Sequence, residues 1–176
     1  HSDLRRQRQM CIRDRDNMSY KLGKRSLERL EGVDERMVAV VKFAIHTTKQ
    51  DFSVLEGLRT IERQRELKDR GASRTMKSKH IPGHAVDLGA YDSVTGIRWE
   101  EALYFEIAEA MKEGAKSVGV GICWGGGWAA SADKEYPYDF RYWTNDMKSL
   151  NKTYHKLRDD QGRDGFNDMP HFELID

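Results

Sequence analysis

The sequence has few of the features that mark disulfide-stabilised, secreted or membrane proteins. Cys11 and Cys123 are its two cysteines, too few to suggest a disulfide framework, so we expect free thiols. No apolar run approaches the roughly 20 residues of a membrane span, and the first residues lack the charged and apolar regions of a signal peptide. We therefore predict a protein that is made in the cytoplasm and does not insert stably into a membrane.

The chain also lacks an excess of either charge. Its 30 basic and 29 acidic residues give a net charge of +1. Residues 1–17 hold five Arg and three Asp, which leaves 25 basic and 26 acidic side chains in residues 18–176. A body this close to neutrality does not favour a nucleic-acid partner, so we expect none.

The N-terminal segment differs in character from the rest. Residues 1–17 show almost no apolar periodicity, and Met18 begins a stretch that reads as a natural start. We interpret 1–17 as a disordered extension that is not native to the protein. Residues 18–176 have the length of a single domain that buries most of its apolar surface.

Three side chains that lie far apart in the sequence suit one metal ion. They are His80, Asp87 and His171. Two imidazoles and a carboxylate are a typical ligand set for catalytic zinc, which leaves its fourth position to water and lowers the pKa of that water to about 7. Asp168, three residues before His171, is a candidate for proton transfer.

The spacing argues against the common zinc-hydrolase motif in which two His lie on one helix. His80 and His84 are four residues apart, but Pro82 lies between them and disfavours the helical conformation of its predecessor. We therefore predict a loop that carries His80. A short buried strand, 84–88, should follow and hold Asp87 rigidly.

Helical and strand patterns alternate along the rest of the chain. We expect four helices: one that begins after the N-cap Asp34, one from the N-cap Thr60 to Gly71, one over 99–118 and one within 145–157. We also expect a strand that begins at Phe52 and strands over 118–124 and 171–174. The apolar stripe of the first helix comprises Met37, Val38, Val41, Ala44 and Ile45, and that of the longest comprises Ala102, Phe105, Ile107, Ala108 and Met111. This order predicts an α+β fold, with helices packed on a small sheet; the pattern alone leaves the pairing of the strands open.

The motifs resemble those of a known family. The pattern Ser78-x-His80-x-x-Gly83-x-Ala85-x-Asp87, followed by Asp168-x-x-His171, is similar to the zinc peptidases of the D-Ala-D-Ala carboxypeptidase and dipeptidase superfamily. Within it, the chain most resembles phage endolysins of the L-alanyl-D-glutamate peptidase type. Supporting segments lie at 22–26, 30–33, 56–60, 71–76 and 124–126 and extend the resemblance from about Met18 to the C-terminus.

The resemblance implies an antiparallel sheet that carries the zinc site. It implies that His80, Asp87 and His171 bind zinc and that Asp168 is the general base. Arg59 and Ser78 would contact the substrate. The family pattern also leads us to expect an acidic residue after Trp-Gly-Gly, where this chain has Gly127.

The implied activity is zinc-dependent hydrolysis of the L-alanyl-D-glutamate bond in the peptidoglycan stem peptide, which lyses the bacterial cell. A phage lysin of this kind would wait in the host cytoplasm, leave through a membrane pore and act as a monomer. Two alternatives stay open. One is a D-Ala-D-Ala carboxypeptidase or dipeptidase with the same site, and the other is a non-catalytic, zinc-containing module that binds the cell wall.

Each singled-out residue also has a structural interpretation. Arg59 could pair with Glu56 or Glu62, Ser78 could end its loop, and Asp168 could cap a turn. We expect structural roles for His46, His84 and His155. The aromatic residues Trp124, Trp128, Tyr142 and Trp143 could line a glycopeptide groove, although we assign at least Trp124 to the core.

Two further segments invite hypotheses. The long connection 128–167 is predicted to form a lid or wall of the substrate groove. On this hypothesis, deleting 131–160 harms hydrolysis more than zinc binding. The acidic cluster Asp159, Asp160 and Asp164 could bind calcium, but its spacing is unlike a standard calcium loop and favours a solvated surface.

Overall fold

The computed structural model describes residues 19–73 and 75–175, so the N-terminal extension 1–17 and Cys11 lie outside the described residues. The helices are α2 Lys24–Arg29, α3 Glu35–Thr47, α4 Ile61–Asp69, α5 Glu101–Val118 and α6 Met147–Asp160, with a short 3-10 helix η1 at Phe140–Tyr142. The strands are β1 Phe52–Glu56, β2 Ala85–Asp92, β3 Gly96–Arg98, β4 Ile122–Trp124 and β5 His171–Leu174.

The strands form one antiparallel sheet. Its order is β1-β2-β5-β4, and β3 pairs with the far end of β2. The last strand along the chain therefore lies between β2 and β4, where it pairs with both. This arrangement confirms the predicted α+β fold with a small antiparallel sheet packed against helices.

Alternation along the strands divides the sheet into two faces. In β2, Val86, Leu88 and Ala90 are fully buried in the main hydrophobic core. In β5, Phe172 and Leu174 join the same core. Because side chains alternate in direction along a strand, Asp87 points to the opposite face, and so do the residues of β5 next to Phe172.

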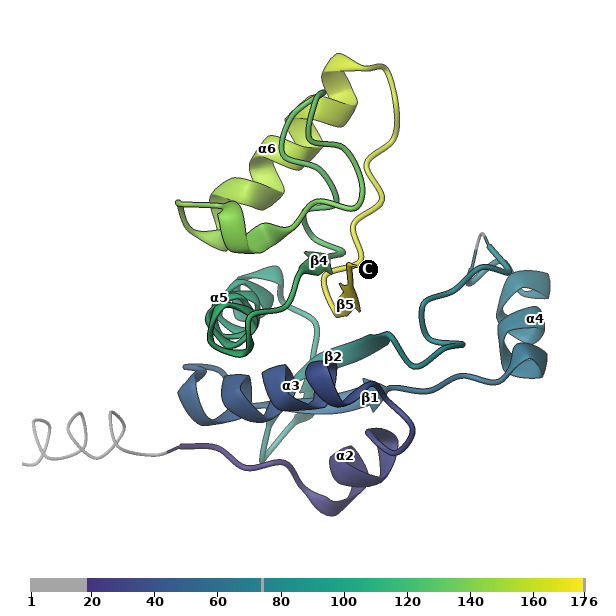
Figure 1. Ribbon diagram of the computed structural model, residues 1–176, viewed down its shortest axis with the longest axis vertical. Helices are drawn as coiled ribbons and strands as arrows, with labels where there is room; N and C mark the ends of the chain where they lie inside the picture. Colours follow the sequence, from purple (N-terminus) through teal and green to yellow (C-terminus); the bar gives the residue numbers. More distant parts are fainter. Residues whose placement is uncertain (1–18, 74, 176) are drawn as a thin grey trace, which may run out of the picture.

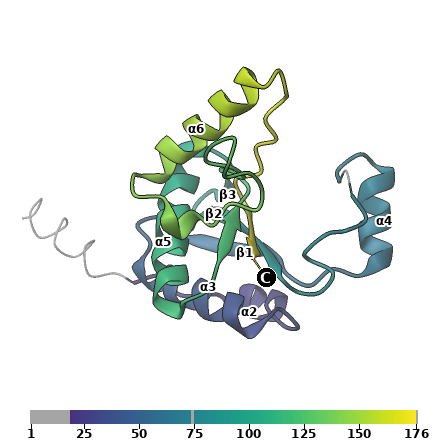
Figure 2. The ribbon, with the colours of Figure 1, turned by 45° about the horizontal axis from the view of Figure 1, so that its top comes forward.

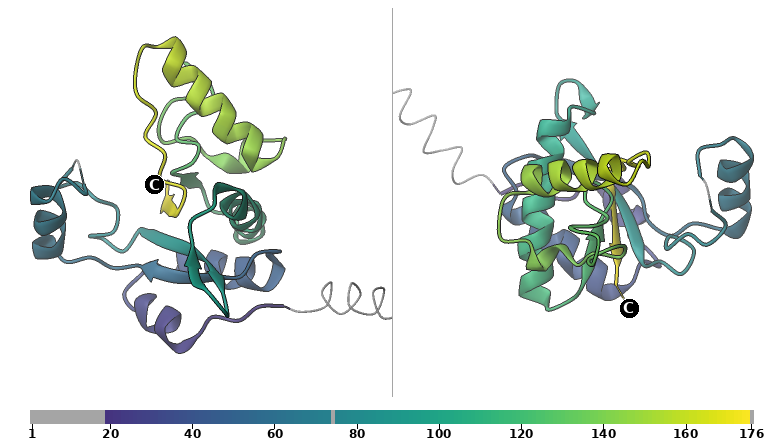
Figure 3. Two further views of the ribbon diagram at one scale, coloured as in Figure 1. Left: turned by 180° about the vertical axis from the view of Figure 1, so that it is seen from behind. Right: turned by 90° about the horizontal axis from the view of Figure 1, so that it is seen from above.

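Two helices cover the core face of the sheet. The helix α3 lies in front of the β1–β2 pair in Figure 1 and behind it in the reverse view of Figure 3, left. The longest helix, α5, contacts α3, β2 and β4. Among the described residues, no helix is both long enough and apolar enough to cross a bilayer.

Two helices lie at the ends of the molecule, and one of them, α6, contributes Met147 and Leu150 to the hydrophobic core. Figure 1 shows α6 at one end, where it contacts α5. Figure 2 shows α4 standing clear of the other helices. The chain leaves the sheet after β1, forms α4 and returns just before β2, so the base of this excursion lies beside the centre of the sheet.

Local capping explains where two helices begin. The Asp34 side chain accepts a hydrogen bond from Arg36 N at the start of α3 (2.9 Å), as expected for an N-cap. The Thr60 hydroxyl accepts from Arg63 N (3.1 Å) at the start of α4. Both predicted N-caps are confirmed.

Several predicted details differ from the structure. In α3, Val40 is fully buried while Val38 only packs against the core. The helix α5 begins at Glu101 rather than Trp99, and Ala102 is exposed. Its buried face includes Tyr104. Residues spaced alternately three and four apart share one face of a helix, whereas the predicted stripe followed a strict three-residue repeat, which moves gradually around the helix.

Two strand boundaries also differ. The strand β2 continues past Leu88 to Asp92, because Ser53 and Phe52 of β1 pair with Gly89 and Ala90. The strand β4 begins at Ile122 rather than at Val118. Gly119 ends α5 in a left-handed conformation with φ of 80°, so the chain cannot become extended before this turn is complete.

The division of the sheet into faces predicts a large difference between two identical substitutions. Leu88→Ala removes a fully buried side chain and should lower the free energy of unfolding by about 2–5 kcal/mol. Leu27→Ala, at a position that is 47% exposed, should change it by no more than about 0.5 kcal/mol. Urea unfolding measures both; similar losses for the two variants would contradict this assignment of the core.

Candidate metal centre

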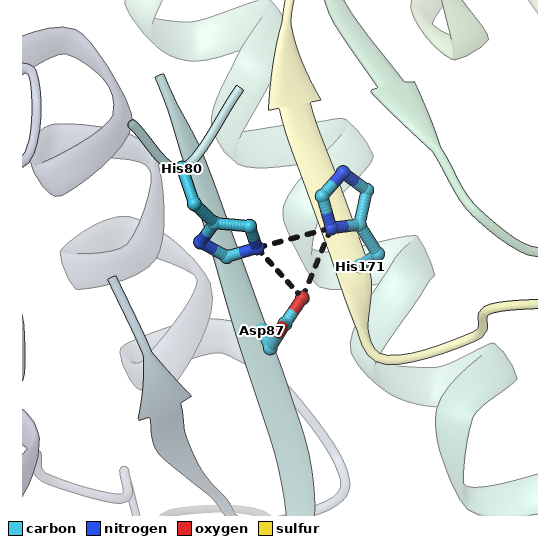
Figure 4. A group of neighbouring side chains, drawn as sticks. All are labelled: His80, Asp87 and His171. Carbon is cyan, nitrogen blue, oxygen red and sulfur yellow. Dashed lines mark hydrogen bonds and ion pairs between the residues drawn. The ribbon is translucent and has the colours of Figure 1, made fainter. Parts of the chain in front are cut away.

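The three predicted ligands meet on the sheet face opposite the helices. Figure 4 shows His80 reaching from its loop, Asp87 from β2 and His171 from β5. Asp87 Oδ1 lies 3.2 Å from His80 Nε2 and 3.0 Å from His171 Nδ1. The two ring nitrogens lie 3.3 Å apart. Asp87 and His171 are opposite each other in the β2–β5 register, which brings their side chains together across the strands.

Backbone groups hold His80 in place. The Gly57 carbonyl lies 2.7 Å from His80 Nδ1, and the His80 carbonyl accepts a hydrogen bond from Arg59 N (3.0 Å). The Ser78 hydroxyl accepts from His80 N (3.3 Å), which is the loop-ending contact that we considered as an alternative for Ser78. His80 is only 2% exposed. The loop therefore fixes both the position and the orientation of this imidazole.

The turn that carries His80 is also tied to the first long helix. It closes at Gly83, where φ is 75° and a Cβ would lie 2.4 Å from the Gly32 carbonyl oxygen, so a side chain is excluded. The Gly83 carbonyl accepts from Asp34 N (2.9 Å). His84 Nε2 lies 3.9 Å from the Asp34 carboxylate, in agreement with a structural role for His84.

Arg59 lies behind Asp87. Its guanidinium donates to Glu56 Oε1 (2.9 Å) and to Gln64 Oε1 (2.7 Å), and it lies 3.7 Å from Asp87 Oδ2. The ion pair with Glu56 that we considered as an alternative is thus present. Its distance from Asp87 Oδ2 places Arg59 to orient this second carboxylate oxygen. The Arg59 side chain is only 9% exposed, and its contact with substrate stays a prediction.

The centre consists of three electron-pair donors that face one another. If each imidazole is neutral, His80 donates through Nδ1 to the Gly57 carbonyl and His171 donates through Nε2 to the Glu173 carboxylate, 2.9 Å away. The lone pairs of His80 Nε2 and His171 Nδ1 then point at each other and at the Asp87 carboxylate. Such an arrangement is repulsive unless a cation occupies the middle.

The electrostatics of the metal-free site agree with this demand for a cation. Burial opposes ionisation of Asp87, but hydrogen bonds from His171 and His80 hold its pKa well below the usual range. Burial also opposes charging of His171, yet hydrogen bonds to Asp87 and Glu173 raise its pKa to about 10. Both shifts favour positive charge between His171 and Asp87, as the donor set does.

The Trp-Gly-Gly segment holds the turn between Asp168 and His171. Gly125 N donates to the His171 carbonyl (2.8 Å), and Asp168 N donates to the Gly125 carbonyl (2.9 Å). A Cβ at Gly125 would lie 2.0 Å from the Asp168 carbonyl oxygen, so this close approach requires glycine. The turn itself is closed by His171 N, which donates to the Asp168 carbonyl (3.0 Å).

The Asp168 carboxylate is left available for chemistry. Its backbone, rather than its side chain, makes the turn, and the carboxylate has no hydrogen bond or ion pair with any other described residue. Burial raises the pKa of Asp168; the charge of Asp87 raises it further, while His171, His80 and Arg59 oppose the shift. A partly desolvated carboxylate next to a cation site is suited to accept a proton.

The absence of an acidic residue after Trp-Gly-Gly has a packing explanation. A Cβ at Gly127 would lie 2.6 Å from Leu150 Cγ in α6. Leu150 is fully buried. An acidic side chain at this position would therefore displace the packing of α6 against the Trp-Gly-Gly loop.

The aromatic residues divide between core and site. Trp124 is fully buried, which confirms its assignment to the core. The Trp128 ring lies 5.5 Å from the His171 ring and forms one side of the site. Tyr142 is 72% exposed, and Trp143 donates to the Asp146 carbonyl at the start of α6.

The remaining predicted polar residues do not join the centre. Within residues 19–73 and 75–175, His80, Asp87 and His171 are the one group of three His, Cys, Asp or Glu residues close enough to share an ion. His155 packs against the Tyr154 ring, and Asp160 pairs with Lys156 (2.7 Å). The acidic cluster is thus part of a charged surface, as the solvated interpretation predicted.

Two buried polar residues, one in contact with Arg59 and one with His171, had not been singled out from the sequence. Gln64 is fully buried; it accepts from Arg59 and donates to the Thr75 carbonyl (2.6 Å). Glu173 is 4% exposed and accepts from His171. No local signal marks Gln64 on its charged helix. Glu173 could have been found, because residues two apart on a strand share a face and His171 is a predicted ligand.

Three donors suited to a cation, on a sheet and with a separate carboxylate beside them, suit a hydrolytic enzyme. A family model for phage L-alanyl-D-glutamate peptidase matches residues 18–146. The chain therefore belongs to the phage L-alanyl-D-glutamate peptidase family and is a peptidase, as its motifs indicated. The match ends before Asp168 and His171; in the structure, the pairing of β2 with β5 places His171 opposite Asp87.

Two relatives support this membership over most of the chain. The L-alanyl-D-glutamate peptidase of Escherichia phage T5 is 31% identical over 121 residues, which are 66% of this chain and 87% of that protein. The crystal structure of the Serratia marcescens L-Ala D-Glu endopeptidase ChiX superposes with a TM-score of 0.63 at 30% identity. The superposition covers 90% of this chain and 93% of that one.

The raised pKa of Asp168 predicts that Asp168→Asn stabilises the metal-free protein. The folded state disfavours the ionised carboxylate relative to the unfolded state, where its ordinary pKa is 3.8. The variant should therefore have the higher free energy of unfolding at neutral pH. The difference should shrink as the pH falls through the raised folded-state pKa and vanish below the unfolded value, where wild-type Asp168 is protonated in both states.

Urea unfolding in the presence of a chelator, at several pH values, measures this difference. Asp164→Asn, which alters an exposed carboxylate nearby in the sequence, serves as the control and should match the wild type. A variant that is less stable than the wild type at neutral pH would show that the Asp168 carboxylate stabilises the fold.

Proposed function

We propose that this chain hydrolyses the L-alanyl-D-glutamate bond of the peptidoglycan stem peptide with a zinc ion held by His80, Asp87 and His171. The observation that carries the proposal is the convergence of three electron-pair donors beside an available carboxylate. Both relatives described above are named for this activity. The alternatives, a carboxypeptidase and a binding module, have no comparable support.

The donor set fits zinc. Zinc binds imidazole nitrogen and carboxylate oxygen at about 2.0–2.1 Å, so the ligands of a tetrahedral site lie about 3.3 Å from one another. The three donor atoms here are separated by 3.0, 3.2 and 3.3 Å. When bound, the zinc ion would supply a water of lowered pKa and polarise the scissile carbonyl.

The chain's own residues would then carry the proton transfers. The Asp168 carboxylate takes a proton from the attacking water and returns it to the amine of D-glutamate as the amide bond breaks. Its raised pKa brings it nearer to the operating pH than an exposed aspartate. The Gly57 carbonyl keeps the His80 proton on Nδ1, and Arg59 orients Asp87 from behind.

The rest of the assignment is proposed on the same basis. His80, Asp87, Asp168 and His171 come from one chain, which supports a monomer. The family match begins at residue 18, which supports 18–176 as the peptidase domain. Light scattering tests the monomer, and the activity of a chain that begins at Met18 tests the domain bounds.

We also propose that the protein waits in the host cytoplasm and reaches the wall through a membrane pore. Expression in the cytoplasm should therefore lyse cells only after the inner membrane is permeabilised.

The activity is tested by mass spectrometry of purified Gram-negative peptidoglycan after digestion. We expect new N-terminal D-glutamate ends when the enzyme is loaded with zinc, and none when a chelator is present. Release of D-alanine would instead establish the carboxypeptidase. Absence of cleavage by a protein with bound zinc would favour the wall-binding module.

Two substitutions separate metal binding from proton transfer. His80→Ala should lose bound zinc and activity together, because two ligands remain of three. Asp168→Asn should keep zinc and lose on the order of 10²–10⁴-fold in kcat, the usual contribution of a general base. Elemental analysis and stem-peptide kinetics measure both, with His155→Ala as the matched histidine control. An active, zinc-loaded Asp168→Asn enzyme would remove Asp168 from this role.

A further inference from the structure

The outer nitrogen of His171 points at a buried carboxylate. His171 Nδ1 faces Asp87 and His80, while Nε2 lies 2.9 Å from Glu173 Oε2. Strand geometry produces this contact, because Glu173 follows His171 by two residues in β5 and thus lies on the same face of the sheet. One imidazole therefore bridges the ligand group and Glu173.

Glu173 is an unusual residue for its position. It is 4% exposed, and its cross-strand neighbours, Ala85 and Cys123, are both fully buried. A carboxylate in such surroundings loses much of its hydration and destabilises the fold unless it is hydrogen-bonded. An apolar side chain would fill the same space without this penalty, so stability alone does not account for a carboxylate here.

A second residue holds Glu173 from the other side. The Tyr136 hydroxyl donates a hydrogen bond to Glu173 Oε1, so the two carboxylate oxygens have different partners. The Tyr136 ring packs edge-on against Trp128, with ring centroids 5.6 Å apart. Trp128 in turn contacts the His171 ring. Tyr136 and Trp128 thus enclose His171 and its carboxylate partner together.

We propose that Glu173, held by Tyr136, is a positioning residue that fixes the His171 proton on Nε2 and thereby presents the Nδ1 lone pair to the metal. The proposal rests on the zinc site put forward above. An imidazole that donates its outer N–H to a carboxylate is oriented, restricted to one tautomer and made a more basic ligand. His80 receives its orientation from a backbone carbonyl instead, so the two histidine ligands are held by different means.

The proposal gives part of the long connection 128–167 a role at the metal. Both Trp128 and Tyr136 belong to it, and both lie next to His171 or its carboxylate partner. A segment that acted only as a lid would affect substrate and leave the ion in place.

The test compares zinc affinity in variants that alter only this contact. Glu173→Gln keeps the size and one oxygen acceptor but removes the charge, and Tyr136→Phe removes only the hydroxyl. Loss of an outer-shell partner typically weakens metal binding about 10- to 100-fold. We expect a loss in this range for Glu173→Gln and a smaller one for Tyr136→Phe, measured by competition with a zinc-binding chelator.

Two matched controls lie away from the site. Glu109→Gln alters a carboxylate that pairs with Lys112 (2.8 Å), and Tyr104→Phe removes a buried hydroxyl that donates to the Arg98 carbonyl (2.8 Å). Both should bind zinc as the wild type does. Thermal unfolding in chelator shows whether each variant is folded without metal, so that a general loss of stability is separated from a specific loss of affinity.

A second measurement does not depend on any variant folding. Long-range proton–nitrogen NMR correlations of the zinc-loaded wild type report which nitrogen of His171 carries the proton. We expect a protonated Nε2 and a zinc-bound Nδ1. The reverse assignment, or wild-type affinity in a folded Glu173→Gln protein, would overturn the role of Glu173. Failure of the wild type itself to bind zinc would instead overturn the proposed metal site.

Discussion

The convergence of three electron-pair donors at one point is the constraint on which this site depends. Asp87 Oδ1, His80 Nε2 and His171 Nδ1 meet within 3.3 Å of one another. Left to themselves, such groups would turn outward and find hydrogen-bond donors. They stay together because each is held from behind, by Arg59, by the Gly57 carbonyl or by Glu173. The contacts behind these three groups are therefore as necessary to the site as the groups themselves.

The two faces of the sheet have different roles: one contributes to the hydrophobic core and the other carries the site. One face carries Val86, Leu88 and Phe172 into the core under α3 and α5. The other face carries the ligands, which do little for the hydrophobic core. Because strand residues alternate strictly between faces, the same short strands, β2 and β5, serve both purposes. The antiparallel register then places Asp87 directly opposite His171.

The Trp-Gly-Gly segment links the two faces. Trp124 is buried in the core and donates to the Met169 carbonyl (2.8 Å), while Gly125 clamps the Asp168–His171 turn by two backbone hydrogen bonds. Core packing of one indole therefore sets the position of the candidate base. This explains why the segment contains a large aromatic residue followed directly by residues without side chains.

Prediction from the sequence succeeded where the signal was local. The caps at Asp34 and Thr60, the strand 171–174 and the loop before Asp87 depend on neighbouring residues, and all are present. It was less accurate where distant partners decide an outcome. The length of β2 depends on pairing with β1, and the buried face of α5 depends on which side meets α3 and the sheet. The pairing of Arg59 with Glu56 was one of two alternatives, because the spacing of residues along a strand and loop does not reveal where a guanidinium points.

The sequence by itself determined the candidate ligands and their order, the candidate base, the capping residues and the alternation of the strands. These are properties of neighbouring residues and motifs, so they can be read along the chain. Only the tertiary structure decided which nitrogen of each histidine faces the centre, that Glu173 and Gln64 are buried beside it, and that the Asp168 carboxylate is partly desolvated. Each of these depends on atoms from segments far apart in the sequence, because hydrogen-bond direction and burial are defined only when those segments have packed.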